Sequence, residues 1–218
     1  MKKLLVAIAL FISMQINAQT VEIDSTSFIA KHGELTFYLD RDTNTFVSVH
    51  KVSYSNITHI TGDRSDKWHT EPPKGPYVHK NAYVHSNYDL GHLTPSNITS
   101  YTDTTNYNSF SLFNQAPQLS YFNRGKWAQL EKQVVKQIKD SGKDAVVITG
   151  VIYNNKDKKY LQGSRIKIPA FYYKILVIEK NTFVWIGDNT NGEIKNSTIG
   201  EVLSLGRSLK NHIDIKIK

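Results

Sequence analysis

Five short apolar runs, rich in β-branched and aromatic residues, dominate the hydrophobic pattern of the chain and predict β-strands. They are residues 34–40 (ELTFYLD), 45–54 (TFVSVHKVSY), 144–153 (DAVVITGVIY), 165–179 (RIKIPAFYYKILVIE) and 182–189 (TFVWIGDN). The first two runs flank a polar turn, and the last two are separated by Lys180-Asn181, so each pair predicts a hairpin. We therefore expect antiparallel pairing in the sheet.

Two segments carry helical periodicity instead. Between residues 123 and 140 the apolar positions recur at steps of three and four, and Gly142 follows as a stop signal. These positions are Trp127, Leu130, Val134 and Ile138. Near the end of the chain, Thr198 and Glu201 have the spacing of a capping box and predict the start of a second helix.

The rest of the chain gives the domain organisation. Residues 62–87 are polar and proline-bearing with no sustained period, which predicts a long surface loop. No linker, repeat or low-complexity segment divides the chain after residue 18. The sequence therefore predicts a single domain over residues 19–218, of the mixed α+β class with a central antiparallel sheet.

The first 18 residues have the layout of a secretory signal peptide. Lys2 and Lys3 precede an apolar run at residues 4–14, and Ala18 follows at a suitable cleavage point. The run is too short to span a bilayer, and no later segment is apolar for long enough. We expect cleavage near Ala18, a secreted or periplasmic chain, and no membrane insertion. The alternative is a buried N-terminal helix.

The amino-acid composition excludes several kinds of site and indicates a kind of partner. The chain contains no cysteine, which excludes disulfides, thiolate metal sites and a thiol nucleophile. It has 27 Lys and Arg against 19 Asp and Glu, and removal of Lys2 and Lys3 lowers the net charge from +8 to +6. A basic exported protein suits a polyanionic partner, such as nucleic acid or an anionic envelope surface.

The stretch YDLGHLTP, residues 88–95, places Asp89 three positions before His92, with Gly91 beside the histidine. A histidine has an ordinary pKa near neutrality, which suits a proton acceptor in catalysis. The alternative is that His92 is one polar residue of a loop, because the chain has eight histidines. The other histidines show no zinc-binding pattern.

Downstream, Asn123 and Glu131 lie two turns apart at the start of the first predicted helix. Free backbone N–H groups and the helix dipole favour an anion such as phosphate at Asn123. The amide oxygen of Asn123 is also a suitable ligand for Mg²⁺, which keeps most of its water shell. Glu131 lies where it can hold a metal-bound water. The alternative is an N-cap at Asn123 and an exposed charged face at Glu131.

Three short motifs occur in order along this part of the chain. They are Asp-x-Gly-His at residues 89–92, Asn-x-x-Pro-Gln at 114–118 and Phe-Asn-x-Gly-x-Trp-x-x-Leu-Glu at 122–131. Together they resemble the DNA/RNA non-specific endonucleases, whose active site is a ββα-metal motif. The resemblance is strongest over residues 62–178 and implies an enzyme that hydrolyses phosphodiester bonds, with DNA and RNA as substrates.

The resemblance also implies a role for individual residues. His92 is expected to be the general base that takes a proton from the attacking water. Asn123 is expected to be the single direct protein ligand of Mg²⁺, with Mn²⁺ as the alternative metal. Glu131 and Asp89 are expected to hold metal-bound waters, and Asn114 to support the site by hydrogen bonding. The metal would neutralise charge on the phosphate and stabilise the leaving oxygen.

Leu90 departs from the family pattern, which has arginine at this position. Loss of one fixed cation of this kind costs on the order of 10² in rate. The candidates to replace it at the substrate phosphate are Arg64, Lys67, Arg124, Lys126 and Arg165. Arg64 is favoured, because a second family arginine lies upstream near an aromatic residue and a proline. Two other functions stay open: a non-catalytic nucleic-acid-binding module on the same fold, and a hydrolase of another phosphodiester or of an acidic glycan.

Overall fold

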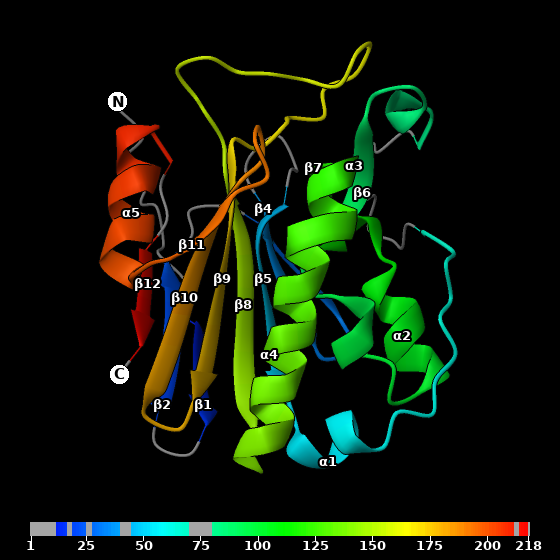
Figure 1. The fold of residues 1–218 in the computed structure, drawn as a ribbon, viewed down its shortest axis with the longest axis vertical. Coiled ribbons are helices and arrows are strands. Elements are labelled where there is room, and N and C mark those ends of the chain that lie inside the picture. The colour runs from blue at the N-terminus through cyan, green and yellow to red at the C-terminus, as the bar shows by residue number, and fades with distance from the viewer. Residues whose placement is uncertain are drawn as a thin grey trace, which may run out of the picture.

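Within the residues that the structure describes, seven antiparallel strands form a central sheet (Figure 1). The computed structural model describes residues 12–16, 19–24, 28–39, 45–69, 80–211 and 214–217. The strands, in their order across the sheet, are β11 (Ile194–Asn196), β10 (Asn181–Asp188), β9 (Phe171–Ile178), β8 (Ala145–Ile152), β5 (Thr45–Val52), β4 (Leu35–Leu39) and β3 (Phe28–His32). Each neighbouring pair is antiparallel, which confirms the predicted α+β class with a central antiparallel sheet.

The described residues also form two smaller sheets. Their strands are β1 (Ile12–Ile16), β2 (Gln19–Asp24) and β12 (Asp214–Ile217) in one, and β6 (Tyr88–His92) and β7 (Gln115–Leu119) in the other. Strand β1 falls inside the predicted signal peptide. The rest of that segment, including the predicted cleavage point at Ala18, lies outside the described residues. Removal of the signal peptide stays a prediction.

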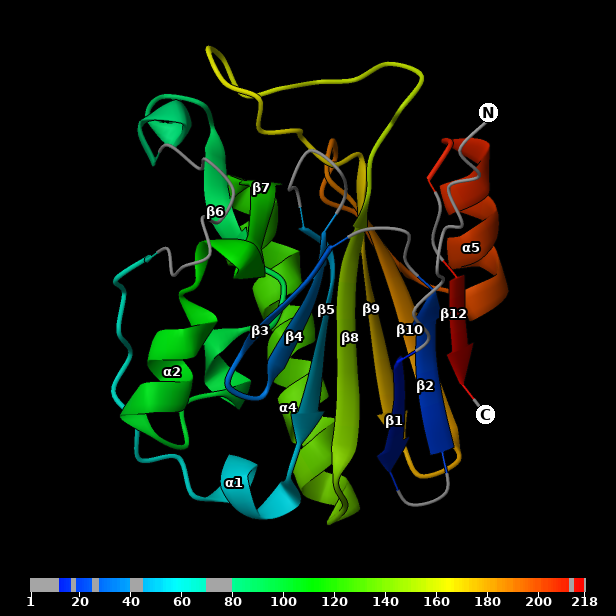
Figure 2. The same ribbon diagram turned by 180° about the vertical axis from the view of Figure 1, so that it is seen from behind.

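Helices and the small sheets cover the two faces of the central sheet. Their bounds are α1 (Tyr54–Thr58), α2 (Asp103–Ser109), α3 (Ser120–Phe122), α4 (Ala128–Ser141) and α5 (Ile199–Ser208), with a π-helical turn η4 (Asn123–Trp127) and 3₁₀ turns η1 (Lys80–Tyr83), η2 (Ser96–Ile98) and η3 (Leu112–Asn114). Helix α4 crosses one face of the sheet, and β1 and β2 lie against the other (Figure 2). In the described part of the chain, no helix has the length and apolarity needed to cross a membrane.

Helix α4 is held on the sheet by its apolar face. Leu130, Val134 and Ile138 are buried in one cluster with residues of β8 and β9. Burial of each such side chain contributes about 1.5–3 kcal/mol relative to exposure. The helix ends at Gly142, which has a φ of 66°, a left-handed conformation that glycine adopts without steric cost.

The hairpins and the second helix form as the sequence predicts. Strand β4 pairs with β5 and β9 pairs with β10, and the capping box of Thr198 and Glu201 begins α5. The predicted surface loop at residues 62–87 is irregular over much of its described part and contains η1; residues 70–79 of it lie outside the described residues.

One strand boundary was wrong. The run at residues 165–179 joins the sheet from Phe171 onward. Its first residues pair instead with the segment before them, because Tyr160 and Lys167 form an antiparallel bridge. The connection between β8 and β9 is therefore a folded loop that projects beyond the sheet (Figure 1).

Gly187 lets helix and sheet approach closely, and its replacement by alanine should weaken the fold. A Cβ at Gly187 would lie 2.5 Å from Phe122 Cζ and 3.4 Å from Trp127 Cζ3. Overpacking of this kind costs about 1–3 kcal/mol, which lowers Tm by about 2–4 °C for each kcal/mol in a chain of this size. Gly200→Ala is the control, because its nearest atom is 3.7 Å away. Equal Tm values for the two variants, measured by circular dichroism, would contradict this packing.

Candidate active site

Strands β6 and β7 pair antiparallel, and the segments α3, η4 and α4 follow β7 directly, which gives the order strand, strand, helix. In this register Asp89 lies opposite Gln118, and His92 lies opposite Gln115. Gly91 has no room for a side chain, because a Cβ there would lie 2.4 Å from Gln118 Oε1. Close packing between the two strands therefore requires the glycine beside the histidine.

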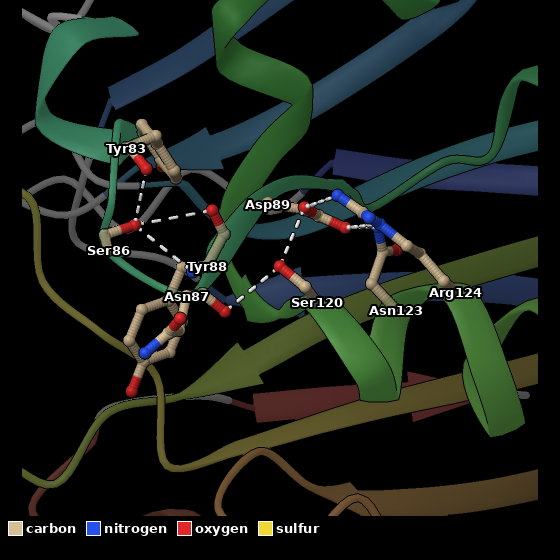
Figure 3. Close-up of polar contacts among 8 residues, drawn as sticks. All are labelled: Tyr83, Ser86, Asn87, Tyr88, Asp89, Ser120, Asn123 and Arg124. Atoms are coloured by element: carbon tan, nitrogen blue, oxygen red, sulfur yellow. Dashed lines mark hydrogen bonds and ion pairs between the residues drawn. The ribbon is translucent and has the colours of Figure 1, made fainter.

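The Asp89 carboxylate joins this hairpin to the start of the helical segment (Figure 3). Ser120 Oγ donates to Oδ1 at 2.9 Å and Asn123 Nδ2 donates to Oδ2 at 2.9 Å. Arg124 donates from Nε and Nη2 at 2.9 and 2.7 Å and forms a two-point ion pair. Burial opposes the ionised form, but these hydrogen bonds hold the pKa of Asp89 below its usual value. Arg124 is exposed, yet its fork of N–H groups is engaged by Asp89.

Asn123 lies one turn inside the helical segment. The helix begins at Ser120, earlier than the sequence predicts, so Asn123 is not its N-cap. A π-helical turn follows, with non-helical dihedral angles at Gly125 (φ −101°, ψ −109°). The spacing between Asn123 and Glu131 is therefore not that of a regular α-helix. Because Asn123 Nδ2 is held by Asp89, the amide is oriented and its oxygen is turned away from that bond.

His92 is enclosed by aromatic rings. The centre of its ring lies 4.5 Å from that of Trp68 and 4.7 Å from that of Phe110, which meets it edge-on. Its Nε2 atom is buried and has no hydrogen-bond partner among the described residues. Burial, followed by the positive charges of Arg64 and Lys174, lowers the pKa of His92 to about 3. The imidazole is therefore neutral at physiological pH and able to accept a proton.

Asn114 is buried behind His92 and fixes the backbone there. Its Oδ1 accepts from the Thr94 N–H at 2.8 Å, and its Nδ2 donates to the carbonyls of Thr94 and Ser109 at 2.7 and 2.8 Å. Its own carbonyl accepts from the Leu93 N–H at 3.0 Å. The two residues after His92 are thus held by Asn114.

Arg64 lies beside the histidine. Its guanidinium carbon is 5.1 Å from the centre of the Phe110 ring, the ring that meets His92. Its Nη1 donates to Ser96 Oγ at 2.6 Å, and its Nε pairs with the exposed Asp66 at 2.6 Å. The sequence singled out Arg64 because it precedes an aromatic residue and a proline. In the structure, the positive charge of Arg64 contributes to lowering the pKa of His92.

Sequence reasoning missed Lys174. Its side chain is fully buried on β9, and Nζ donates to Thr149 Oγ1 at 2.6 Å and to the Leu93 carbonyl at 3.4 Å. Nζ also lies 3.9 Å from Glu131 Oε1 and 4.9 Å from the centre of the Trp127 ring. A lysine in the middle of an apolar strand was the available signal, because a buried ammonium needs a partner of opposite charge.

The ionisation of Glu131 is governed by this environment. Burial raises the pKa of Glu131, and the charge of Lys174, followed by that of Arg64, opposes the rise. Burial also lowers the pKa of Lys174. Arg64 and Lys174 act electrostatically on both His92 and Glu131, so these four side chains form one group. Asp89, Asn123 and Arg124 form a second group beside it.

The side chain of Leu90 makes apolar contacts. It packs against a cluster of three buried side chains, Tyr83, Leu161 and Ile166. The position at which the sequence resemblance implies an arginine is therefore part of an apolar contact between β6 and the β8–β9 loop. Position 90 therefore supplies no positive charge to this part of β6.

Comparison with known proteins gives the same architecture. A family model described as DNA/RNA non-specific endonuclease matches residues 13–206. A nuclease of Serratia marcescens is 29% identical over 203 residues, which span 84% of this chain and 74% of that protein. The crystal structure of the EndoG/EndoGI complex contains a chain with a TM-score of 0.69 at 19% identity, covering 83% of this chain and 84% of that one. At that identity the structural likeness shows the fold alone.

The neutral state of His92 makes the free energy of unfolding depend on pH. Its folded pKa is about 3, against 6.5 for a free histidine. Below pH 6.5 the unfolded chain binds a proton that the folded chain does not, so the free energy of unfolding should fall by up to about 1.4 kcal/mol per pH unit as the pH drops toward 3. Denaturant unfolding in EDTA should show a shallower fall in His92→Gln. Identical slopes would contradict the burial of a neutral His92.

Proposed function

The chain belongs to the DNA/RNA non-specific endonuclease family, a family of hydrolases, and from this premise we propose that it is an exported, Mg²⁺-dependent nuclease that hydrolyses phosphodiester bonds in DNA and RNA. The observation that carries the proposal is a neutral, half-buried imidazole at His92 on the same strand as Asp89, the residue that orients the amide of Asn123. His92 and Asn123 lie on β6 and on the segment that follows β7, and the hydrogen bond from Asn123 to Asp89 links that segment to the strand that carries His92.

His92 fits the role of general base. Its Nε2 has unused hydrogen-bonding capacity among the described residues, and the ring is held by aromatic contacts and by the anchored backbone after it. The low pKa keeps the base ready to accept a proton from water at neutral pH, although it weakens the base relative to a free histidine. A bound phosphate would offset the cations that depress this pKa.

Asn123 and Glu131 fit a hard divalent cation. In the described part of the chain, no group of three or more His, Asp or Glu is placed to hold a metal, so the ligands proposed are one amide oxygen and waters. The Glu131 side chain is 15% exposed, and its carboxylate lies beyond hydrogen-bond distance of Lys174 at 3.9 Å, which leaves it able to hold a water. Mg²⁺ keeps several waters and needs few protein ligands, and Mn²⁺ is the alternative metal.

Each residue then has a defined task. When bound at Asn123, the metal supplies positive charge to the scissile phosphate and the leaving oxygen. Arg64 donates hydrogen bonds to a phosphate oxygen, in place of the arginine that Leu90 replaces. Asp89 orients the Asn123 amide and holds Arg124, in addition to the water-holding role proposed for it. Sequence-independent contacts of this kind suit both DNA and RNA.

Export rests on the N-terminal segment. We propose that cleavage near Ala18 releases the chain into the periplasm or the medium, because Lys2, Lys3 and the following apolar run have the layout of a signal peptide. The basic net charge suits a polyanionic substrate met outside the cytoplasm.

A second candidate function is a nucleic-acid-binding module without catalysis. Leu90 favours it, because the strand position of the family arginine carries an apolar side chain packed in a cluster. Such a module would bind DNA in a salt-dependent way and release no product at any Mg²⁺ concentration.

Nuclease activity should depend on metal, base and amide together. The chain beginning at Gln19, incubated with circular plasmid and with RNA, should degrade both in Mg²⁺ and neither in EDTA. His92→Ala and Asn123→Ala should each lose at least about 10² in rate, because each removes a group that acts in the transition state. Circular dichroism checks that the variants fold. Full activity of Asn123→Ala would overturn the metal assignment, and intact substrates beside a gel shift for the unmodified chain would favour the binding module.

Arg64 and Arg124 should differ in their effect on the reaction. Arg64→Ala should lower kcat by about 10² if its guanidinium contacts the phosphate, whereas Arg124→Ala should act through Asp89 and Asn123 and reduce the affinity for Mg²⁺. Exposed Lys67, in the same segment as Arg64, provides the control Lys67→Ala. Initial rates across a Mg²⁺ titration separate the two effects. A Lys67 variant as slow as the Arg64 variant would remove the phosphate role from Arg64.

A further inference from the structure

The β8–β9 loop concentrates positive charge. Residues 153–168 contain five basic residues and one acidic residue, a net charge of +4 in 16 residues of a chain whose total is +8. The exposed cations are Lys156, Lys158, Lys159 and Arg165. Within the part of the chain that the structure describes, none of these four forms an ion pair. Their charge is therefore available to a partner.

The loop has a defined shape. Leu161 N–H donates to the Ile166 carbonyl at 3.0 Å, and Ile168 N–H donates to the Lys159 carbonyl at 2.8 Å, which makes a small hairpin. Its turn contains Gly163 with a φ of 69°, a conformation that favours glycine. Its cations are thus carried on an ordered hairpin.

Two contacts dock this hairpin on the active-site strands. Leu161 and Ile166 pack with Tyr83 and Leu90 in the apolar cluster beside β6. The buried amide of Asn189 makes the second contact. Its Nδ2 donates to the carbonyls of Pro117 and Pro169, at 3.0 and 2.9 Å, and its Oδ1 accepts from the Leu119 N–H at 3.0 Å. The amide therefore ties β7 to the end of the loop.

The docking places the hairpin at the edge of the site. Leu90 is two residues before His92 on β6, and Tyr83 of the same cluster donates to Gln115 Oε1 at 2.5 Å, the residue paired with His92. Both ribbon views show the loop reaching toward the end of the molecule that carries β6 and β7 (Figures 1 and 2). Leucine at position 90 thus joins a charged loop to the strand that carries the base.

We infer that the β8–β9 hairpin, docked through Leu90, is a binding surface for the phosphate backbone of a polynucleotide. The inference rests on the proposed function and adds to that site a surface that contacts the backbone beyond the scissile phosphate. The four cations are exposed and dispersed, so each contributes a weak, salt-screened attraction that adds up along several phosphates. Tyr160, 43% exposed on the same hairpin, offers a ring face to a base. A single small phosphodiester spans too little of this surface to gain from it.

The test compares two fourfold variants of the full chain beginning at Gln19. In one, Lys156, Lys158, Lys159 and Arg165 are each replaced by Gln. In the control, Lys136, Lys139, Lys143 and Lys180 are each replaced by Gln. The control cations lie near the opposite end of β8, about 25 Å away at 3.3 Å per strand residue. Both variants lose the same net charge, and the control differs in the position of its cations and in the exposed ion pairs that Lys136 and Lys143 form with Asp140 and Glu179.

Binding to a 30-base-pair DNA duplex is measured in EDTA by fluorescence anisotropy across a series of salt concentrations. The loop variant should bind at least 10-fold more weakly at 100 mM salt and lose about 2–4 from the slope of log K against log salt, because each lost phosphate contact removes about 0.9. The control variant should stay within about threefold of the unmodified chain. Equal losses in the two variants, or none in either, would overturn the inference.

A second readout separates this inference from the proposed function. In Mg²⁺, a threefold variant in which Lys156, Lys158 and Lys159 are replaced by Gln and Arg165 is kept should raise KM for plasmid while kcat on bis(4-nitrophenyl) phosphate stays unchanged. Absence of cleavage by the unmodified chain would refute the proposed function. The binding measurement in EDTA would still show whether the β8–β9 hairpin binds the polynucleotide backbone. Cleavage of plasmid with an unchanged KM in this variant would refute the binding role of the hairpin and leave the proposed nuclease function standing.

The docking role of Leu90 is tested by changing the size of its side chain. Leu90→Ala removes apolar contact with Leu161 and Ile166 without any change in charge, and should weaken duplex binding at least threefold. Leu90→Met keeps the contact and should bind like the unmodified chain. Duplex binding by Leu90→Ala equal to that of Leu90→Met would overturn the docking role of Leu90.

Discussion

The buried ammonium of Lys174 is the constraint on which the site depends. It lies where the central sheet, helix α4 and the backbone after His92 meet, and it contacts Glu131, Thr149 and the Leu93 carbonyl at once. A charge removed from water is tolerable when it keeps a partner of opposite sign and hydrogen-bond acceptors. The sheet therefore accepts Lys174 because α4 supplies Glu131. The same contact links the helix, and with it the Glu131 carboxylate, to the backbone that follows His92.

The electrostatics of the site follow from that arrangement. Burial, together with the positive charges of Arg64 and Lys174, holds the imidazole of His92 neutral, and the same two cations favour ionisation of Glu131 against the effect of its burial. A neutral base and a region of positive charge are what a phosphate ester and an attacking water require together. The Asp89 group, with Asn123 and Arg124, stands beside it as a separate hydrogen-bonded unit. Leu90 stands on β6 where the sequence resemblance implies an arginine, and its side chain packs against the basic β8–β9 loop.

Local patterns in the sequence predicted much of this. The apolar runs, the helical steps and the capping box identified the hairpins and helices, and His92, Asn123 and Glu131 followed from spacing and family resemblance. Contacts between distant segments could not be read locally. The partner of Lys174 lies 43 positions away at Glu131, and the cluster around Leu90 includes Leu161, 71 positions on. The π-helical turn η4 could not be predicted from the sequence either, because apolar residues recur at helical spacing through it and on into α4.

Direct observation of the metal tests the central claim, that an oriented Asn123 amide and a water held by Glu131 make a divalent-cation site beside His92. A crystal of the protein soaked in Mn²⁺ and measured at the manganese absorption edge gives an anomalous difference map that locates the ion. We expect one strong peak within bonding distance of Asn123 Oδ1, with Glu131 and Asp89 reaching it through waters, and loss of that peak in Asn123→Ala. A peak bonded directly to other side chains, or no peak near Asn123, would contradict this metal site.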